Sequence, residues 1–159
     1  GYTIPATSAA TETWNGTNWT SVNSMNTARR LVSGDGTNTS SLAFGGWTPY
    51  YDNTESWNGT NWTEVADLNT ARYAIAGAGA DNTSSLAFGG YSPPSGAESK
   101  LTELWNGSSW TETTDLNAVR GYSSATGIAT AALCIGGPGA AVEQFTGAGA
   151  GVTRTFTDS

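Results

Sequence analysis

A segment with two tryptophans occurs three times in this sequence, and this repeat limits the possible folds more than any other feature. It reads WNGTNW at 14–19, WNGTNW at 57–62 and WNGSSW at 105–110, so the first tryptophans lie 43 and then 48 residues apart. Each copy continues to an arginine and then to an apolar segment that ends in two glycines. Repeats of this length are typical of stacked or radially arranged units, each burying its apolar face against its neighbours. The repeated positions are Trp14, Trp57 and Trp105; Trp19, Trp62 and Trp110; Arg29, Arg72 and Arg120; and the pairs Gly45 with Gly46, Gly89 with Gly90 and Gly136 with Gly137.

The segments within one unit have the composition of strands. They are short, rich in Thr, Trp, Tyr, Val and Ala, and bounded by Gly, Asn, Asp or Pro, and no window sustains the 3.6-residue apolar period of a helix. Asn-Gly between the two tryptophans predicts a tight hairpin in which the indole rings face each other across adjacent strands. Four strands are expected in each unit. One runs through SLAFGG, one through the Glu-x-Trp segment, one from the second tryptophan towards Asn-x-x-Arg, and one follows the arginine. Four antiparallel strands per unit predict an all-β fold of propeller blades.

An apolar strand ending in Gly-Gly, a loop, Glu-x-aromatic, Trp and Leu-Asn-x-x-Arg together resemble the kelch repeat, from about residue 10 to residue 145. The resemblance implies a kelch-like β-propeller. We predict a single domain over 1–159, with repeats at about 1–46, 47–90 and 91–137 and a partial repeat at 138–159. In the partial repeat Glu143 and Phe145 keep the register, but the second tryptophan and the Leu-Asn-x-x-Arg motif are absent. About three and a half blades cannot close a ring, so we expect missing upstream blades or further copies of the chain to complete it.

Composition argues against several classes of partner. The formal net charge of −7 disfavours nucleic acid and anionic lipid. There is no histidine, and the single cysteine, Cys134, lies in an apolar run, so we expect no metal and no cofactor. The apolar runs are shorter than the roughly 20 residues that span a bilayer, so no membrane insertion is expected.

One loop of the unit varies in length while the rest stays nearly constant. The distance from the glycine pair to the next Glu-x-aromatic segment changes from copy to copy, through WTPYYDNT, YSPPSGAESK and PGAA. A constant framework with one variable loop is a common design of recognition surfaces. Aromatic residues and arginine are favoured at such contacts. The alternative is that the loop changes length without any function. The candidate ligand-binding residues are Trp47, Tyr50, Tyr51 and Tyr91, clustered near Arg30 and Tyr73.

The repeated charged residues are interpreted as structural. Glu12, Glu55 and Glu103 occupy identical positions, whereas a catalytic carboxylate pair needs two different environments. We therefore assign no catalytic residue, and expect the repeated arginines to tie one blade to the next through carbonyls or these glutamates. The glycine pairs are expected to allow close strand packing. The segment Asp35-Gly36-Thr37 is predicted as a turn.

These observations favour a non-enzymatic structural or recognition module that binds a glycan or protein on a cell surface. The outward positions carry Thr, Ser and Asn rather than charged residues, which suits a virion or extracellular location. The sequence of the repeat also resembles the repeats of kelch-like proteins of bacteriophages, marine ones especially. This resemblance implies a location on a tail fibre or virion and a role in host attachment. It also implies association with other virion proteins or with further copies of the chain itself. An intracellular kelch adaptor for protein partners is the alternative, and a propeller glycosidase is a third reading.

Overall fold

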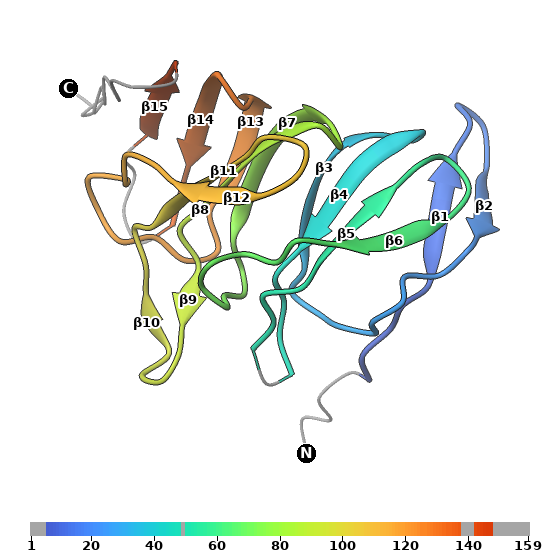
Figure 1. Ribbon diagram of the computed structural model, residues 1–159, viewed down its shortest axis with the longest axis horizontal. Coiled ribbons are helices and arrows are strands. Elements are labelled where there is room, and N and C mark those ends of the chain that lie inside the picture. The colour runs from blue at the N-terminus through green and yellow to red at the C-terminus, as the bar shows by residue number, and fades with distance from the viewer. Residues whose placement is uncertain (1–5, 49, 138–141, 148–159) are drawn as a thin grey trace.

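The structure is a computed structural model that describes residues 6–48, 50–137 and 142–147. Within these ranges the chain is built of antiparallel β-strands and turns, and no helix is present. The strands stand in successive sheets from the N-terminal to the C-terminal side of the molecule (Figure 1). The predicted all-β class is confirmed.

The described strands form four larger sheets and one short hairpin. The first sheet pairs β1 (Thr11–Trp14) with β2 (Trp19–Val22). The second contains, in spatial order, β3 (Ser33–Thr37), β4 (Ser40–Phe44), β5 (Thr54–Trp57) and β6 (Trp62–Val65). The third contains β7 (Ala76–Asp81), β8 (Ser84–Phe88), β11 (Thr102–Trp105) and β12 (Trp110–Glu112), and the fourth contains β13 (Ser124–Ile128), β14 (Ala131–Ile135) and β15 (Val142–Thr146). The hairpin pairs β9 (Tyr91–Ser92) with β10 (Ala97–Glu98).

Spatial order follows chain order in each of these sheets, so neighbouring strands are joined without crossovers. The first strand of each later sheet packs on that of the sheet before it, β7 on β3 and β13 on β7 (Figure 1). The second and third sheets cover 33–65 and 76–112, so each combines residues from two of the repeats predicted at 1–46, 47–90 and 91–137.

The two-tryptophan segment forms the predicted hairpin, closed by a four-residue loop. In the first copy the Asn15 side-chain oxygen accepts the backbone N–H of Thr17 and of Asn18, both at 2.9 Å, and Gly16 has a φ of +96°. Trp14 lies opposite Trp19 in the register, with ring centroids 5.5 Å apart. The later copies give 5.3 and 5.4 Å with similar tilts. Such a pair contributes about 0.5–1.5 kcal/mol beyond its buried area.

In the second and third hairpins the second tryptophan also contacts the preceding sheet. The Trp62 indole N–H donates to the Thr11 hydroxyl at 3.0 Å, and that of Trp110 donates to the Thr54 hydroxyl at 3.0 Å. Trp110 packs edge-on against Phe44, with centroids 5.1 Å apart. The hairpin is therefore both a local clamp and a joint between sheets.

A buried arginine–glutamate pair joins each sheet to the next. Each arginine follows the last strand of one sheet, and each glutamate lies on the third strand of the following one. The guanidinium–carboxylate distances are 3.1 Å for Arg29–Glu55, 2.8 Å for Arg72–Glu103 and 2.9 Å for Arg120–Glu143, with all these side chains buried. This agrees with the structural role expected for the repeated arginines and for Glu55 and Glu103. Glu12 is exposed and forms no such pair among the described residues.

Both partners of the pair make further hydrogen bonds, although the buried Nε of Arg72 has no partner among the described residues. Arg72 donates to the carbonyls of Gly89 and Leu101 at 2.7 and 2.8 Å. The other oxygen of Glu103 accepts the backbone N–H and the side-chain amide of Asn69 at 2.7 and 2.8 Å. Burying a charge is costly unless it is paired and hydrogen-bonded in this way. Burial lowers the pKa of Arg72, and the Glu103 carboxylate opposes that shift.

The glycine pairs make room for the backbone that carries these arginines. Gly89 has a φ of +69°, and a Cβ there would lie 2.6 Å from the carbonyl oxygen of Arg120. The Gly90 N–H donates to the same oxygen at 2.7 Å. Gly45 contacts the Arg72 carbonyl in the same way. The fourth sheet keeps positive φ at Gly136 and Gly137.

The buried pair should dominate stability at its position. Replacing Glu103 by alanine leaves the Arg72 guanidinium buried without its counter-charge, so we expect a loss of about 3–5 kcal/mol in the free energy of unfolding. Glu12 occupies the equivalent position in the first sheet but is exposed, so Glu12→Ala should change stability by only about 0.5 kcal/mol. Urea unfolding of both variants measures this difference. Equal losses would contradict the linking role of the pair.

Candidate functional site

The loops after β4 and β8 project from the same side of the molecule, the lower side in Figure 1. Their bases lie beside the segments that follow the buried arginines. Trp47 pairs with Arg30 through an N–H···O bond of 2.7 Å, and Tyr73 and Tyr91 exchange backbone bonds of 3.2 and 3.0 Å. The variable loops are thus fixed at their bases although their lengths differ.

Five aromatic side chains form a continuous group on this side, which we call the aromatic ladder. Ring centroids lie 4.8 Å apart for Trp47–Tyr50 and 4.6 Å apart for Trp47–Tyr73. Tyr73 stacks on Tyr91 at 5.1 Å with an interplanar angle of 17°, and Tyr91 contacts Tyr122 at 5.4 Å. The ladder therefore joins residues of two consecutive repeats, 47–90 and 91–137.

The backbone beneath the ladder is held in an unusual conformation. Leu31, Ala74 and Tyr122 occupy equivalent positions two residues after the buried arginines, and all three have positive φ, between +50° and +53°. Ala74 donates its N–H to the Leu31 carbonyl at 3.2 Å and accepts from the Tyr122 N–H at 3.3 Å. Non-glycine residues adopt this conformation at a cost and often lie at functional sites.

A glycine makes room for the stack. Gly121 is the equivalent of Arg30 and Tyr73, and a Cβ at Gly121 would lie 2.0 Å from the Tyr91 ring. The ring of Tyr91 therefore lies directly against the backbone at this position. No larger residue fits there without moving Tyr91.

The structure brings together four of the six residues predicted for the site as a ring cluster: Trp47, Tyr50, Tyr73 and Tyr91. Arg30 adjoins the cluster through its backbone pairing with Trp47. Tyr51 bonds through its backbone to Gly46 and to Arg72 instead, at 3.1 and 3.2 Å, and no ring contact joins it to the ladder among the described residues. Whether any of these residues binds a ligand stays a prediction.

The sequence prediction missed Tyr122, which ends the ladder and is 63 % exposed. Its position after Arg120 gave a signal, because Tyr73 was selected for a similar place after Arg72. The aromatic residue lies one position later in this copy, with Gly121 before it.

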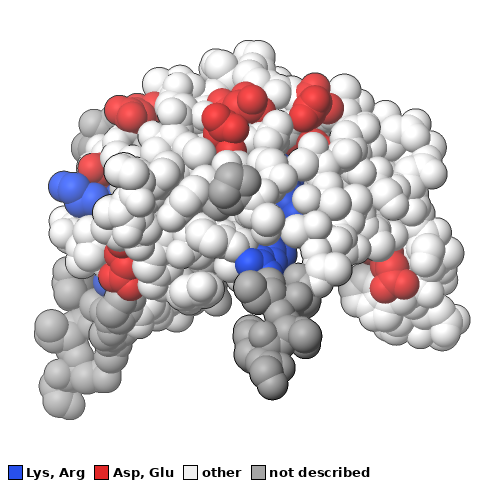
Figure 2. Space-filling view, turned by 90° about the horizontal axis from the view of Figure 1, so that it is seen from below, with Lys and Arg blue, Asp and Glu red and all other residues white. Residues whose placement is uncertain are grey.

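The face that carries the ladder is largely uncharged. Figure 2 views the molecule from this side and shows a mostly neutral surface with separate acidic and basic groups. Glu98 accepts the Tyr91 hydroxyl hydrogen bond at 2.9 Å. Burial raises the pKa of both Tyr73 and Tyr91. Their hydroxyls are therefore neutral donors near pH 7.

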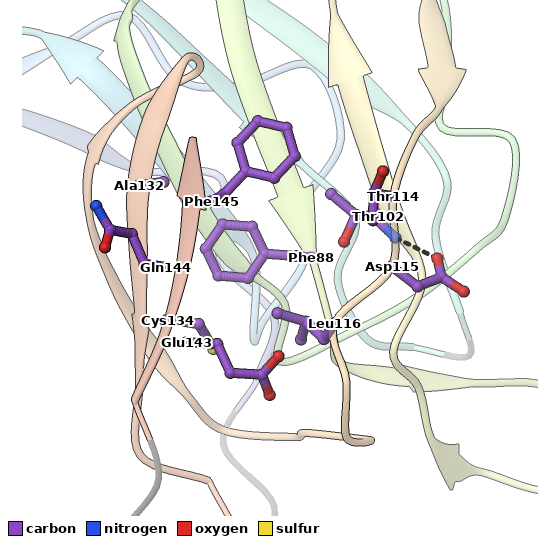
Figure 3. Close-up of a pocket in the computed structure, with 10 residues that line it drawn as sticks. All are labelled: Phe88, Thr102, Thr114, Asp115, Leu116, Ala132, Cys134, Glu143, Gln144 and Phe145. Atoms are coloured by element: carbon purple, nitrogen blue, oxygen red, sulfur yellow. Dashed lines mark hydrogen bonds between the residues drawn. The ribbon is translucent and has the colours of Figure 1, made fainter. Parts of the chain in front are cut away.

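A small cavity between the third and fourth sheets is a poor ligand site. Figure 3 shows Phe88, Leu116 and Phe145 around it, with the Asp115 carboxylate bonded to the Thr102 N–H at 3.2 Å. Its volume is about 20 Å³, enough for about one water molecule. Burial raises the pKa of the neighbouring Cys134 thiol, which argues against a reactive thiolate.

Asp35 is a half-buried acid outside the ladder. The segment Asp35-Gly36-Thr37 lies in strand β3, so the turn prediction was wrong, because Gly36 is accommodated within the strand at a φ of +105°. The Asp35 carboxylate accepts the Ser85 hydroxyl at 2.5 Å. A Cβ at Gly79 would lie 2.7 Å from the other carboxylate oxygen. Burial raises the pKa of Asp35 to about 7, and the bond from Ser85 opposes the shift.

Comparisons with known proteins give no assignment. No family model matches the chain, and no curated protein matches it. Among the described residues, no group of three or more acidic or cysteine side chains is placed to hold a metal ion. In the same part of the chain, no helix has the length and apolar character that a membrane crossing requires.

The Asp35 carboxyl should make stability depend on pH. Between the ordinary aspartate pKa of 3.8 and about 7, the folded protein keeps a proton that the unfolded chain releases. Stability should therefore fall as pH rises through this window, by up to about 1.4 kcal/mol per pH unit for this group. Urea unfolding midpoints of the wild type and Asp35→Asn, measured from about pH 4 to about pH 7, should diverge as the pH rises. Parallel pH profiles would contradict this assignment.

Proposed function

We propose that this chain is a segment of a kelch-like β-propeller that serves as a non-enzymatic recognition module. Three observations support the architecture: sheets whose strands follow chain order, first strands that pack on one another as β3, β7 and β13 do, and the same buried ion pair between successive sheets. The residues of the kelch-like repeat lie at equivalent places in the second and third sheets. A propeller places its variable loops on one face, where a ligand contacts several blades.

The aromatic ladder carries the functional part of this proposal. It joins residues of two successive repeats in contacts of 4.6 to 5.4 Å on a mostly neutral face. Aromatic rings flanked by hydroxyl donors offer apolar surface and hydrogen bonds together, which suits sugar rings. We favour a glycan on a cell surface as the ligand. The low charge and the Thr-, Ser- and Asn-rich sequence favour a virion or extracellular setting, such as a phage tail fibre.

The exposed end of the ladder gives the cleanest test. Tyr122→Ala removes a ring that is 63 % exposed, so it should weaken glycan binding about tenfold while leaving the unfolding free energy nearly unchanged. Ile128→Ala, which removes another exposed apolar side chain at the far end of β13, the strand that follows Tyr122, is the control and should bind as the wild type does. A glycan array selects the ligand, and calorimetry of the three proteins measures the affinity.

Two results would contradict the proposal. One is wild-type affinity in the Tyr122→Ala variant for every glycan that the array selects. The other is an array without any bound glycan combined with saturable binding of a protein that Tyr122→Ala abolishes, which would assign the ladder to protein recognition.

A further inference from the structure

The first sheet differs from its equivalents in what covers it. In the second and third sheets the strand with the first tryptophan pairs with a strand on each side, as β5 does with β4 and β6. Among the described residues β1 pairs only with β2. Trp14 is 44 % exposed and Trp19 is 65 % exposed, whereas the equivalents Trp57 and Trp110 are 4 % and 5 % exposed.

A groove of about 440 Å³ runs along the uncovered side of β1. Glu12 and Met25 line one wall, and Val32, Asp35 and Leu42 line another. Glu12 occupies the position of Glu55 and Glu103, but within the described residues its hydrogen bond is a long one of 3.5 Å from the Ser21 hydroxyl. The groove lies where the first two strands of a complete sheet would pack.

The fourth sheet shows the complementary difference. Its described strands are β13, β14 and β15, without the fourth strand that carries the second tryptophan elsewhere. In the third sheet that tryptophan, Trp110, reaches back to Phe44 and Thr54. The equivalents in the next joint, Phe88 and Thr102, line the cavity of about 20 Å³ in Figure 3. The cavity therefore marks the position of an absent tryptophan.

We propose that copies of this chain associate head to tail, with the β1–β2 hairpin of one copy pairing with β14 of the next in the place that β15 holds. Trp19 then fills the cavity beside Phe88, and its indole N–H reaches the Thr102 hydroxyl. Glu12 takes the place of Glu143. The strands β13 and β14 occupy the groove beside β1 and complete a four-stranded sheet.

Charge and hydrogen bonding match in this arrangement. In the single chain Glu143 accepts bonds from the Arg120 side chain at 2.9 Å and from the Asn117 N–H at 2.6 Å. Glu12 lies at the same place in its strand, one residue after Thr11 and two before Trp14, as Glu143 follows Val142 and precedes Phe145. Glu12 therefore presents the same carboxylate to Arg120. The two strands compete for one site.

Two other arrangements match less well. The first and fourth sheets lie at opposite ends of the molecule in Figure 1, so the hairpin cannot reach β14 of its own chain. Packing the hairpin as a separate sheet beside β15 would direct Trp19 at Val142, which stands where the other sheets have Thr11, Thr54 and Thr102. Valine has no hydroxyl to accept the indole N–H. Only the arrangement in which the hairpin replaces β15 gives the Trp19 indole N–H a hydroxyl acceptor and the Glu12 carboxylate an arginine partner.

Sedimentation velocity of the 1–159 chain over a wide range of concentration tests the proposal. We expect the weight-average mass to rise with concentration for the wild type. Trp19→Ser and Thr102→Val should each weaken this association at least about tenfold, since they remove the two sides of one contact. Phe145→Ser should strengthen the association, because it weakens the competing strand. Thr60→Ala is the control, because Thr60 lies in the exposed turn of the second hairpin, outside the proposed contact, and the variant should associate as the wild type does.

A photo-crosslinking amino acid at position 19 gives a second readout that does not depend on stability. The expected crosslink joins two copies and maps to the segment 86–116 or to β14. A chain that stays monomeric at every concentration would overturn the proposal and assign the β1 edge to another occupant. Association that Trp19→Ser leaves unchanged, or crosslinks that map elsewhere, would also overturn it.

Discussion

The buried arginine–glutamate pair is the interaction on which the rest of the structure depends. Each pair spans two sheets, since Arg72 follows the second sheet and Glu103 lies in the third. The same arginine bonds to a carbonyl just after β8 and to one just before β11, and the same carboxylate accepts the Asn69 N–H. The backbone of Arg72 can approach the second sheet only because Gly45 leaves space for the Arg72 carbonyl, as Gly89 does for that of Arg120. One interaction thus fixes the positions of three segments that are distant in sequence.

The aromatic ladder follows from that constraint. The residues after each arginine adopt a positive φ and bond to one another from sheet to sheet, and this places Tyr73 beside Tyr91 and Tyr91 beside Tyr122. The loops can vary in length because their bases are held by backbone pairs. A rigid joint beneath and a variable loop above are what a recognition surface requires. The buried pairs therefore fix the backbone that positions the proposed glycan site.

Several features could be predicted from the sequence because they repeat. Trp57 and Trp62, Glu55 and Arg29 recur at fixed spacing, and a recurring residue has the same role in each copy. Tyr122 was missed because its exact equivalents are Leu31 and Ala74, so only its closeness to the repeated Arg120 marked it. The burial of Asp35 was missed because it depends on Gly77 and Gly79 of the next sheet, whose approach the sequence alone does not show. The different exposures of Trp19 and Trp110 likewise depend on neighbouring sheets rather than on local sequence.

The central claim, that a buried ion pair locks each sheet to the next, is tested most directly by native-state hydrogen exchange. The backbone N–H of Asn69 donates to Glu103 in the following sheet at 2.7 Å, although Asn69 itself is exposed. Its amide should therefore exchange only on global unfolding, with the slow rate of the central strand amides in β8. Exchange as fast as that of Asn58–Thr60, in the exposed turn of the second hairpin, would show that the joint opens freely and would contradict the account.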